Sequence, residues 1–243
     1  MQLSARNPRA LIGFLRAPVR LQTYKNLAYL AVQFPLGIAY FTTLVASLAL
    51  GISLSLVLVG IPLLLGTLVL VTGIVRAEGE LANQLLTVDV ETRDVGIELE
   101  EGLLPYTKGL LLDAGTYIGL VYSLSKLFVG VVTFSLLSFC LSLTGGLLAA
   151  PVLYNHPDSY HFLYDTTLTL APEVRLVDDF WSITFAPIIT LSEWNVDTLG
   201  EALIVAILGL VVLIISLNIL NAFAHGLGLL TARVLQHARS LEV

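Results

Sequence analysis

Two histidines and two aspartates lie within a ten-residue stretch of the chain: His156, Asp158, His161 and Asp165. Imidazole nitrogens and carboxylate oxygens are ligands that divalent metals accept. Their spacing matches no recognised metal motif, and polar loops beside membranes commonly contain such residues. The sequence therefore predicts no bound metal and no cofactor, with a metal site as the alternative interpretation.

The same region holds further side chains that could contact a ligand. Adjacent carboxylates can attract a cation, and tryptophan can stack on a ligand or anchor at a membrane interface. A solvated acidic turn and an aromatic belt are the simpler interpretations. The candidates for contact with a ligand or stimulus are His156, Asp158, His161, Asp178, Asp179, Trp181 and Trp194.

Asn218, Asn221 and His225 form a second polar group, inside an otherwise apolar stretch. Amides buried in a membrane usually hydrogen-bond between helices, which is the interpretation that we favour over substrate binding. The sequence contains no phosphate-binding loop, nucleophile motif or zinc signature. We therefore expect no enzymatic activity; an intramembrane enzyme is the weakest of the alternatives.

Long uncharged segments must position these residues. Residues 26–75 form a run of fifty residues without Asp, Glu, Lys, Arg or His, bounded by Lys25 and Arg76. One helical crossing of a bilayer needs roughly 20 apolar residues. This run is therefore long enough for two crossings, which predicts a helical hairpin in lipid.

The composition of the whole chain agrees with a membrane protein. Of the 243 residues, 56% are hydrophobic and 12% are charged, whereas soluble domains carry about 25% charged residues. Further uncharged runs lie in the second half of the chain. The sequence predicts an all-α integral membrane fold with spans near 33–52, 54–75, 127–148 and 202–222.

The distribution of cations predicts the orientation. Lys and Arg cluster before the first span, between the second and third, and after the fourth. Cytoplasmic segments carry such an excess, so we expect a multi-pass protein of the cell membrane with both termini cytoplasmic. Segment 149–201 is then outside, and its acidity suits a high-salt or cation-attracting exterior. The net charge of −6 argues against nucleic acid as a partner.

These inferences divide the chain into seven segments. We expect a basic amphipathic helix at the inner leaflet, a transmembrane hairpin, a cytoplasmic linker with an approach helix, a third span, an outer segment, a fourth span and an amphipathic cytoplasmic tail. Their bounds are 1–32, 33–75, 76–126, 127–148, 149–201, 202–222 and 223–243.

The sequence also predicts an internal duplication. At an offset of 93, Thr23-Tyr24 aligns with Thr116-Tyr117 and Tyr29 with Tyr122, and at an offset of 149 Gly79 aligns with Gly228. Two spans per half give both halves the same orientation, as in a parallel repeat. The residues expected at helix contacts are Gly37, Gly60, Pro62, Gly130, Gly209, Asn218 and Asn221, with Pro62 as a kink in the second span.

Turns and strands are expected where the two halves differ. The first half is expected to turn near Gly51-Ile52-Ser53, whereas the second carries an insertion that opens at the helix-breaking Pro151. Stretches 166–170, 173–177 and 181–185 have the composition of strands. We expect a small irregular, β-containing outer segment.

Three motifs resemble the putative sensor domain, a membrane module that often precedes a histidine kinase in archaea and bacteria. They read FPLGIAYF at 34–41, VGIPLL at 59–64 and WNVDTLGEAL at 194–203. The resemblance covers about residues 22–238 and implies a four-span sensory module. No kinase segment follows the fourth span in this sequence, so we expect the output to pass through a protein partner.

Two functional readings remain open beside catalysis. The first is a membrane sensor whose cytoplasmic tails, 76–86 and 225–237, present a change to a signalling partner. The second is a subunit of a transporter or channel, for which a parallel repeat is also suitable. The lipid bilayer is the expected environment in both, and a homodimer is compatible with both.

Overall fold

The structure is a computed structural model of the chain. It describes residues 13–90, 109–154 and 198–238, and the backbone of six short stretches between them: 161–162, 168–170, 174–178, 181–185, 189–191 and 194–196. The chain forms two compact units. The first comes from Met1–Ser142 and Leu213–Val243, and the second comes from Leu143–Val212.

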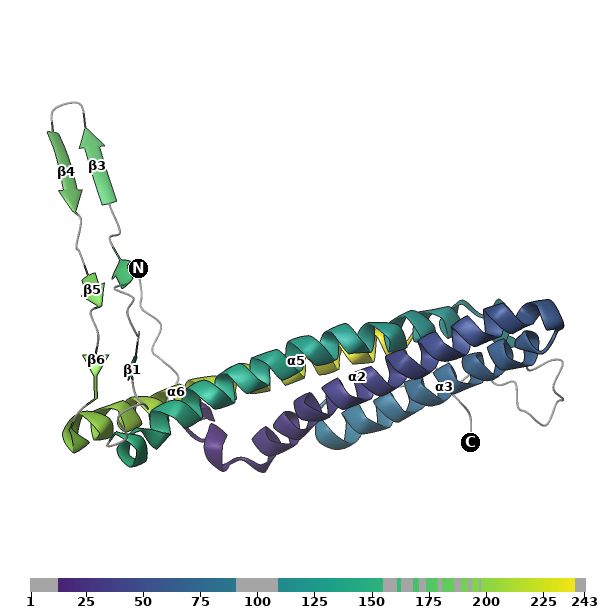
Figure 1. Ribbon diagram of the computed structural model, residues 1–243, viewed down its shortest axis with the longest axis horizontal. Helices are drawn as coiled ribbons and strands as arrows, with labels where there is room; N and C mark the ends of the chain where they lie inside the picture. Colours follow the sequence, from purple (N-terminus) through teal and green to yellow (C-terminus); the bar gives the residue numbers. More distant parts are fainter. Residues whose placement is uncertain are drawn as a thin grey trace. The chain divides into compact units, whose positions relative to one another are not determined.

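Four helices among the described residues are long and apolar enough to cross a membrane. They are α2 (Leu21–Leu54), α3 (Gly60–Leu85), α5 (Ala114–Leu153) and α6 (Leu199–Leu235) (Figure 1). The shortest, α3, has 26 residues. At about 1.5 Å per residue it is roughly 39 Å long, which exceeds the roughly 30 Å of a bilayer core. The chain is thus a multi-pass helical membrane protein, as predicted.

The approach segments are continuous with the helices that follow them. After the short 3₁₀ helix η1 (Ala17–Val19), α2 begins at Leu21 and continues to Leu54 without a break at residue 32. Likewise α5 runs unbroken from Ala114. Its start is capped by Asp113, whose Oδ1 accepts a hydrogen bond from the N–H of Gly115 at 3.0 Å.

The first hairpin turns later than the sequence suggested. Helix α2 continues through Gly51, a second 3₁₀ helix η2 (Ser55–Val57) follows, and the chain reverses at Leu58, which has a φ of 65°. The prediction of a turn near Gly51-Ile52-Ser53 is therefore wrong. Gly51 serves a different purpose, because a Cβ there would lie 2.6 Å from the side chain of Leu64.

Prolines also depart from their expected roles. Pro62 is the third residue of α3, in the first turn, where backbone N–H groups have no intrahelical partner, so it does not interrupt the helix. Pro151 lies inside α5, which continues to Leu153, rather than ending it. A proline this close to the end of a helix removes only one hydrogen bond from the last turn. Pro35 lies in the interior of α2.

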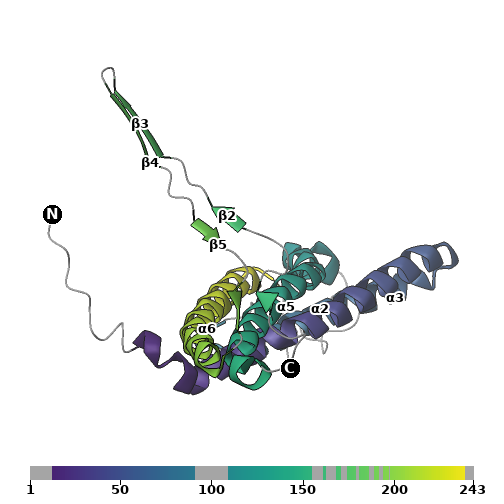
Figure 2. The ribbon, with the colours of Figure 1, turned by 60° about the vertical axis from the view of Figure 1, so that its left-hand side comes forward.

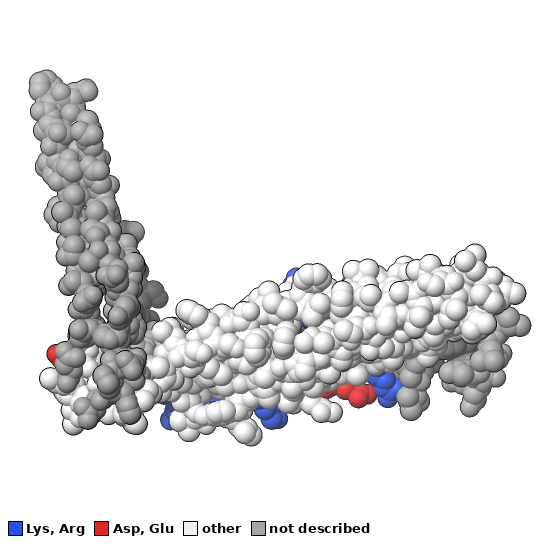
Figure 3. Space-filling model, viewed as in Figure 1, with Lys and Arg blue, Asp and Glu red and all other residues white. Residues whose placement is uncertain are grey.

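All four helices contribute to the core of the first unit. Its buried apolar side chains include Leu30 of α2, Val75 of α3, Leu137 of α5 and Leu220 of α6. Many other large apolar residues are exposed, among them Phe128 at 69%. Little of the described surface in Figure 3 carries Lys, Arg, Asp or Glu. Exposed apolar surface of this extent is what a lipid-facing exterior requires.

The second unit has a small core of its own. Leu147 and Ala150 of α5 are buried with Ala202 and Val205 of α6. At the start of α6, the N–H of Glu201 donates to Thr198 Oγ1 at 3.3 Å, and the N–H of Thr198 donates to Glu201 Oε2 at 3.2 Å. This reciprocal arrangement is a capping box, which satisfies two backbone donors at the start of the helix.

Among the described residues, six short strands lie between α5 and α6 in the sequence. They pair as three antiparallel ladders that are nested in chain order, β1 with β6, β2 with β5 and β3 with β4. Figure 2 shows β3 beside β4 and β2 beside β5. The strand bounds are β1 His161–Phe162, β2 Leu168–Leu170, β3 Val174–Asp178, β4 Trp181–Phe185, β5 Ile189–Leu191 and β6 Trp194–Asn195.

Candidate functional site

A buried ion pair lies in the first unit. The ammonium of Lys126 in α5 pairs with Oε2 of Glu78 in α3, and the side chains are 1% and 0% exposed. Two ionised groups lose much hydration energy when they are buried, so such pairs persist only with further polar partners. In membrane proteins, ionisable residues buried among the helices are uncommon and frequently functional.

Other helices supply the further partners of Lys126. Its Nζ donates a hydrogen bond of 2.7 Å to Gln33 Oε1 of α2, and it lies 5.0 Å from the centroid of the Tyr122 ring. An ammonium over the face of a tyrosine ring is attracted by the ring quadrupole. The cation is thus held by a carboxylate, an amide oxygen and an aromatic face.

Tyr122 extends the network to α6. Its hydroxyl lies 3.4 Å from Glu78 Oε2, to which it donates, and 3.2 Å from Thr231 Oγ1. We call Gln33, Glu78, Tyr122, Lys126 and Thr231 the ion-pair network. It takes side chains from α2, α3, α5 and α6, so a change in the packing of any one of these helices alters a polar contact at this centre.

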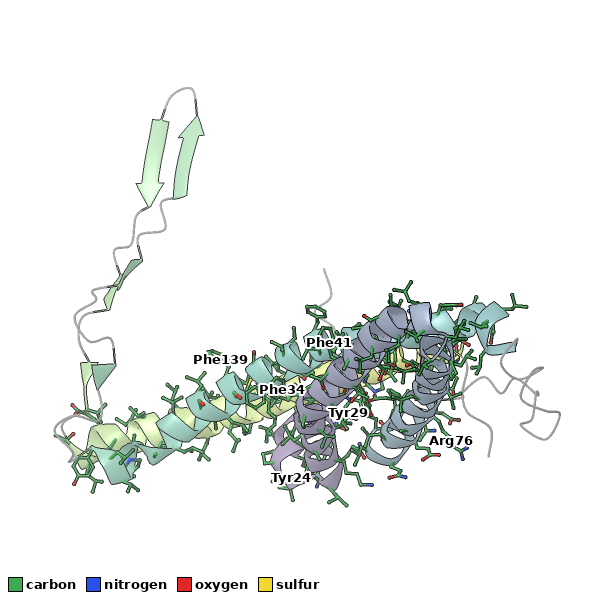
Figure 4. All side chains as sticks on the ribbon, turned by 45° about the vertical axis from the view of Figure 1, so that its right-hand side comes forward. Tyr24, Tyr29, Phe34, Phe41, Arg76 and Phe139 are labelled. Carbon is green, nitrogen blue, oxygen red and sulfur yellow. The ribbon has the colours of Figure 1, made fainter. Side chains whose placement is uncertain are left out.

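The ion-pair network has unused hydrogen-bonding capacity. Two buried atoms of the network have no hydrogen-bond partner among the described residues: Gln33 Nε2 and Glu78 Oε1. Tyr29 lies within electrostatic range of Glu78, and Figure 4 labels it among the helices, in contrast to Arg76 on the outside of α3. Buried polar atoms are nearly always paired with protein or water. The centre can therefore accept a further donor–acceptor group such as water.

The sequence analysis did not identify these residues. Glu78 and Lys126 flank the uncharged runs, where charged side chains normally face water. The available signal was the alignment of the halves, because the offset of 93 that pairs Tyr29 with Tyr122 also pairs Gln33 with Lys126. An amide and a cation at equivalent positions beside equivalent tyrosines could have marked one polar centre.

A second polar network contains two of the predicted packing residues. Asn26 Nδ2 donates to Asn221 Oδ1 at 2.9 Å, and Asn221 Nδ2 donates to Thr23 Oγ1 at 3.0 Å. Asn218 Nδ2 donates to the backbone oxygen of Phe14 at 3.0 Å. Both asparagines of α6 therefore bond to the N-terminal part of the first unit.

A pocket of about 240 Å³ lies beside these amides. We call it the Arg20 pocket. Residues at the start of α2 that line it are Arg20, Gln22, Thr23 and Asn26. Asn218, Asn221 and His225 of α6 line it too, with Leu86 and Thr87 after α3. His225, which the sequence grouped with the two asparagines, thus lies at the same pocket.

The predicted packing glycines lie at close backbone approaches. A Cβ on Gly37 would lie 2.5 Å from the backbone oxygen of Lys126, and a Cβ on Gly130 would lie 2.7 Å from that of Gln33. Near this crossing of α2 and α5, the rings of Phe34 and Phe134 stack with centroids 4.7 Å apart. Small residues at helix crossings are typical of membrane proteins.

The other two glycines also meet backbone atoms. A Cβ on Gly60 would lie 2.6 Å from the carbonyl carbon of Leu54, within the first hairpin. In the second unit, a Cβ on Gly209 would lie 3.1 Å from the carbonyl carbon of Leu147. Both glycines of the second-helix pair thus permit close approach to the preceding long helix.

The ligand candidates fall in the strand region. His156, Asp158, Asp165 and Asp179 lie outside the described residues. The backbone of Asp178, at the end of β3, pairs with that of Trp181, at the start of β4. His161 pairs with Asn195, and Trp194 pairs with Phe162 on the next rung. Within the described part of the chain, no group of three or more His, Cys, Asp or Glu residues could hold a metal ion.

Comparison with known proteins identifies a family. No curated protein and no solved structure matches the chain. A family model described as "Putative sensor" matches residues 29–235. The match includes α3, α5 and α6 and all but the first turns of α2. The chain therefore belongs to the putative sensor family.

Proposed function

We propose that this protein is a non-catalytic signal-input module of the membrane that acts through a protein partner. Membership of the sensor family and four membrane-crossing helices support this role. The observation that carries the proposal is the ion-pair network, because its hydrogen bonds join all four helices around one buried charge pair.

Burial makes this contact suitable for a two-state response. Removing one partner of a buried ion pair typically costs about 3–5 kcal/mol, because the other charge is left uncompensated. Intermediate arrangements, with Glu78 and Lys126 half separated, are therefore unfavourable. A stimulus that changes helix packing would favour one of two discrete states, which is how a sensor converts binding into a signal.

The network lies where the two cytoplasmic tails are expected to begin. Glu78 belongs to tail 76–86 and Thr231 belongs to tail 225–237. The tails also pack together, since a Cβ on Gly228 would lie 2.6 Å from the side chain of Leu86. A partner that contacts either tail would thus detect a change in the other.

The predicted parallel repeat remains part of the proposal. Two pairs of contacts support it. Gly37 meets the backbone of Lys126 as Gly130 meets that of Gln33, and both exchanges follow the offset of 93. Similarly, Gly60 meets Leu54 as Gly209 meets Leu147. The two glycines are 149 positions apart, and the two leucines are 93 positions apart.

We also propose the predicted topology, with both termini cytoplasmic and the strand region outside. The candidate stimulus site then includes Asp178 and Trp181, whose backbones pair. We further propose the seven segment bounds given above, a protein partner at the tails and a homodimer.

Crosslinking tests the proposal directly. The intact protein would be crosslinked in its native membrane, captured, and identified with its neighbours by mass spectrometry. We expect a kinase or transcription regulator to be crosslinked to the C-terminal end of α3 or α6. The yield of this crosslink should differ between Lys126→Met and the wild type. Recovery with an ATPase or a second transport subunit would contradict the sensor role.

Transport is the second candidate function, and the unpartnered atoms of the ion-pair network favour it. Proton and ion pathways commonly contain buried ionisable groups that are incompletely paired. Purified protein in sealed vesicles would show ion or proton flux if the network lined a pathway. We expect no flux above that of empty vesicles. Flux that Glu78→Gln abolishes would favour transport instead.

A further inference from the structure

The Arg20 pocket lies apart from the ion-pair network, and eight of the nine described residues that line it have polar side chains. Leu86 is its one apolar lining residue, and Arg20 its one charged residue at neutral pH, with no carboxylate among the described residues that line it. Arg20 is exposed, and its guanidinium has no ion-pair or hydrogen-bond partner within the described chain. An unpaired guanidinium beside a polar cavity favours an anion.

Hydrogen bonds among the amide side chains that line the pocket fix the orientation of each amide group. Gln22 Nε2 donates to Asn26 Oδ1 at 2.8 Å and to the backbone oxygen of Leu85 at 2.8 Å. Asn26 donates in turn to Asn221, and Asn221 to Thr23. These hydrogen bonds use one of the two amide hydrogens of Asn221 and leave the second available to a ligand.

The backbone adds positive potential at the same place. The first turn of α2 has no side-chain cap and no acidic residue. The N-terminus of a helix carries a partial positive charge that stabilises anions. This partial charge adds to the positive charge of Arg20 at the pocket.

Volume restricts the size of the occupant. Pockets for drug-sized ligands measure roughly 300–1,000 Å³, so about 240 Å³ suits a smaller group. Arginine binds phosphate oxygens through two parallel hydrogen bonds. We propose that the Arg20 pocket binds a phosphoryl group, carried either by a lipid headgroup or by a small soluble phosphate compound. Binding of a phosphoryl group is independent of the proposed signalling role, and it can be measured without a protein partner.

Thermal protection of the full-length protein tests this inference. The chain has one cysteine, Cys140, which is 5% exposed, so its reaction with a thiol dye reports unfolding. One arm adds inorganic phosphate to protein in micelles of an alkyl maltoside, a detergent that carries no phosphate. The other adds phosphatidic acid to the micelles. We expect the unfolding midpoint to rise in at least one arm, and the responding arm identifies the source.

Matched variants separate the pocket from general attraction of the basic N-terminal region. Arg20→Gln should weaken the apparent affinity about tenfold or more, the loss expected for a charge-assisted hydrogen bond. Arg16→Gln removes an exposed arginine outside the pocket and should leave the response unchanged. A His225→Leu variant alters the part of the lining that α6 supplies and should also weaken binding.

Two results would overturn the inference: no protection in either arm, or an equal loss in Arg16→Gln and Arg20→Gln. Lys126→Met keeps the two proposals distinguishable. Protection of this variant by phosphate would support pocket binding. A change in its crosslink to a partner would bear only on the signalling role.

Discussion

Lys126 of α5 donates a hydrogen bond of 2.7 Å to Gln33 of α2, and these two residues are 93 positions apart. The same offset aligns Thr23 with Thr116 and Tyr29 with Tyr122. A residue meets its own equivalent where a two-fold axis passes. This hydrogen bond is therefore the contact expected near an axis between two related halves, and it supports the proposed repeat.

Removing the buried cation should destabilise the protein strongly. Lys126→Met leaves the Glu78 carboxylate buried without its counter-charge, which typically costs about 3–5 kcal/mol. The midpoint of thermal unfolding, followed by dye labelling of Cys140, should fall accordingly. Combining Glu78→Met with Lys126→Met should recover much of the loss, because well-packed apolar residues can replace an ion pair.

The surface pair Arg76–Glu80 provides the control for this experiment. Its atoms are 2.9 Å apart, and the side chains are 34% and 59% exposed. Exposed pairs contribute about 1 kcal/mol or less, so Glu80→Met should change the midpoint little. Equal effects of Lys126→Met and Glu80→Met would show that burial of the ion pair has no special energetic role.

Adding one methyl group at the crossing of α2 and α5 should also destabilise the fold. Gly130→Ala would place a Cβ 2.7 Å from the backbone oxygen of Gln33, so the helices must separate. Overpacking of this kind costs about 1–3 kcal/mol. The cysteine-labelling assay would measure the change in the unfolding midpoint.

Gly66 in α3 is the matched glycine for that comparison. A Cβ there meets nothing within 4 Å, so Gly66→Ala should be neutral or should stabilise the helix by about 0.5–1 kcal/mol through its better helix propensity. If Gly130→Ala behaved like Gly66→Ala, the close approach at Gly130 would not exist in the membrane.

The turn of the first hairpin should tolerate glycine better than leucine. Leu58 has a φ of 65°, which costs a residue with a Cβ about 1–2 kcal/mol. Leu58→Gly should therefore raise the unfolding midpoint modestly, after the entropy that glycine adds to the unfolded chain is subtracted. Leu56→Gly, two residues earlier and within η2, should lower it.

Loss of the capping box should loosen the start of α6. Thr198→Ala removes the acceptor of the Glu201 N–H and should cost about 1 kcal/mol of helix stability. Hydrogen exchange followed by mass spectrometry would detect faster exchange in peptides that cover residues 199–203. Thr198→Ser keeps the hydroxyl and should exchange like the wild type; slow exchange in Thr198→Ala would contradict the cap.

Hydrophobicity alone predicted the four long helices, because a bilayer sets a minimum length that uncharged runs either reach or do not. Helix ends were less predictable. Pro62 and Pro151 are helix breakers by type, yet both lie within a turn of a helix end, where little hydrogen bonding is lost. Only the fold shows which turn of a helix a proline occupies.

Of the site, the sequence identified the asparagines of α6 but not the ion-pair network. Asn218 and Asn221 stand out because polar amides are rare in an apolar run. Glu78 and Lys126 lie at the ends of such runs, where charged residues are ordinary. Their burial depends on the packing of all four helices, which periodicity in one sequence does not determine.

Positions 33 and 126 align at the offset of 93 but hold different residues, Gln33 and Lys126, and this difference has a consequence for symmetry. Two identical chains related by an axis must present the same residue at both positions. Two lysines there would bring like charges together, and two glutamines would leave a buried carboxylate without a cation. In the proposed repeat, joining both halves in one polypeptide removes this restriction, so a single chain can hold one acid, one base and one amide at a centre that a homodimer of either half could not assemble.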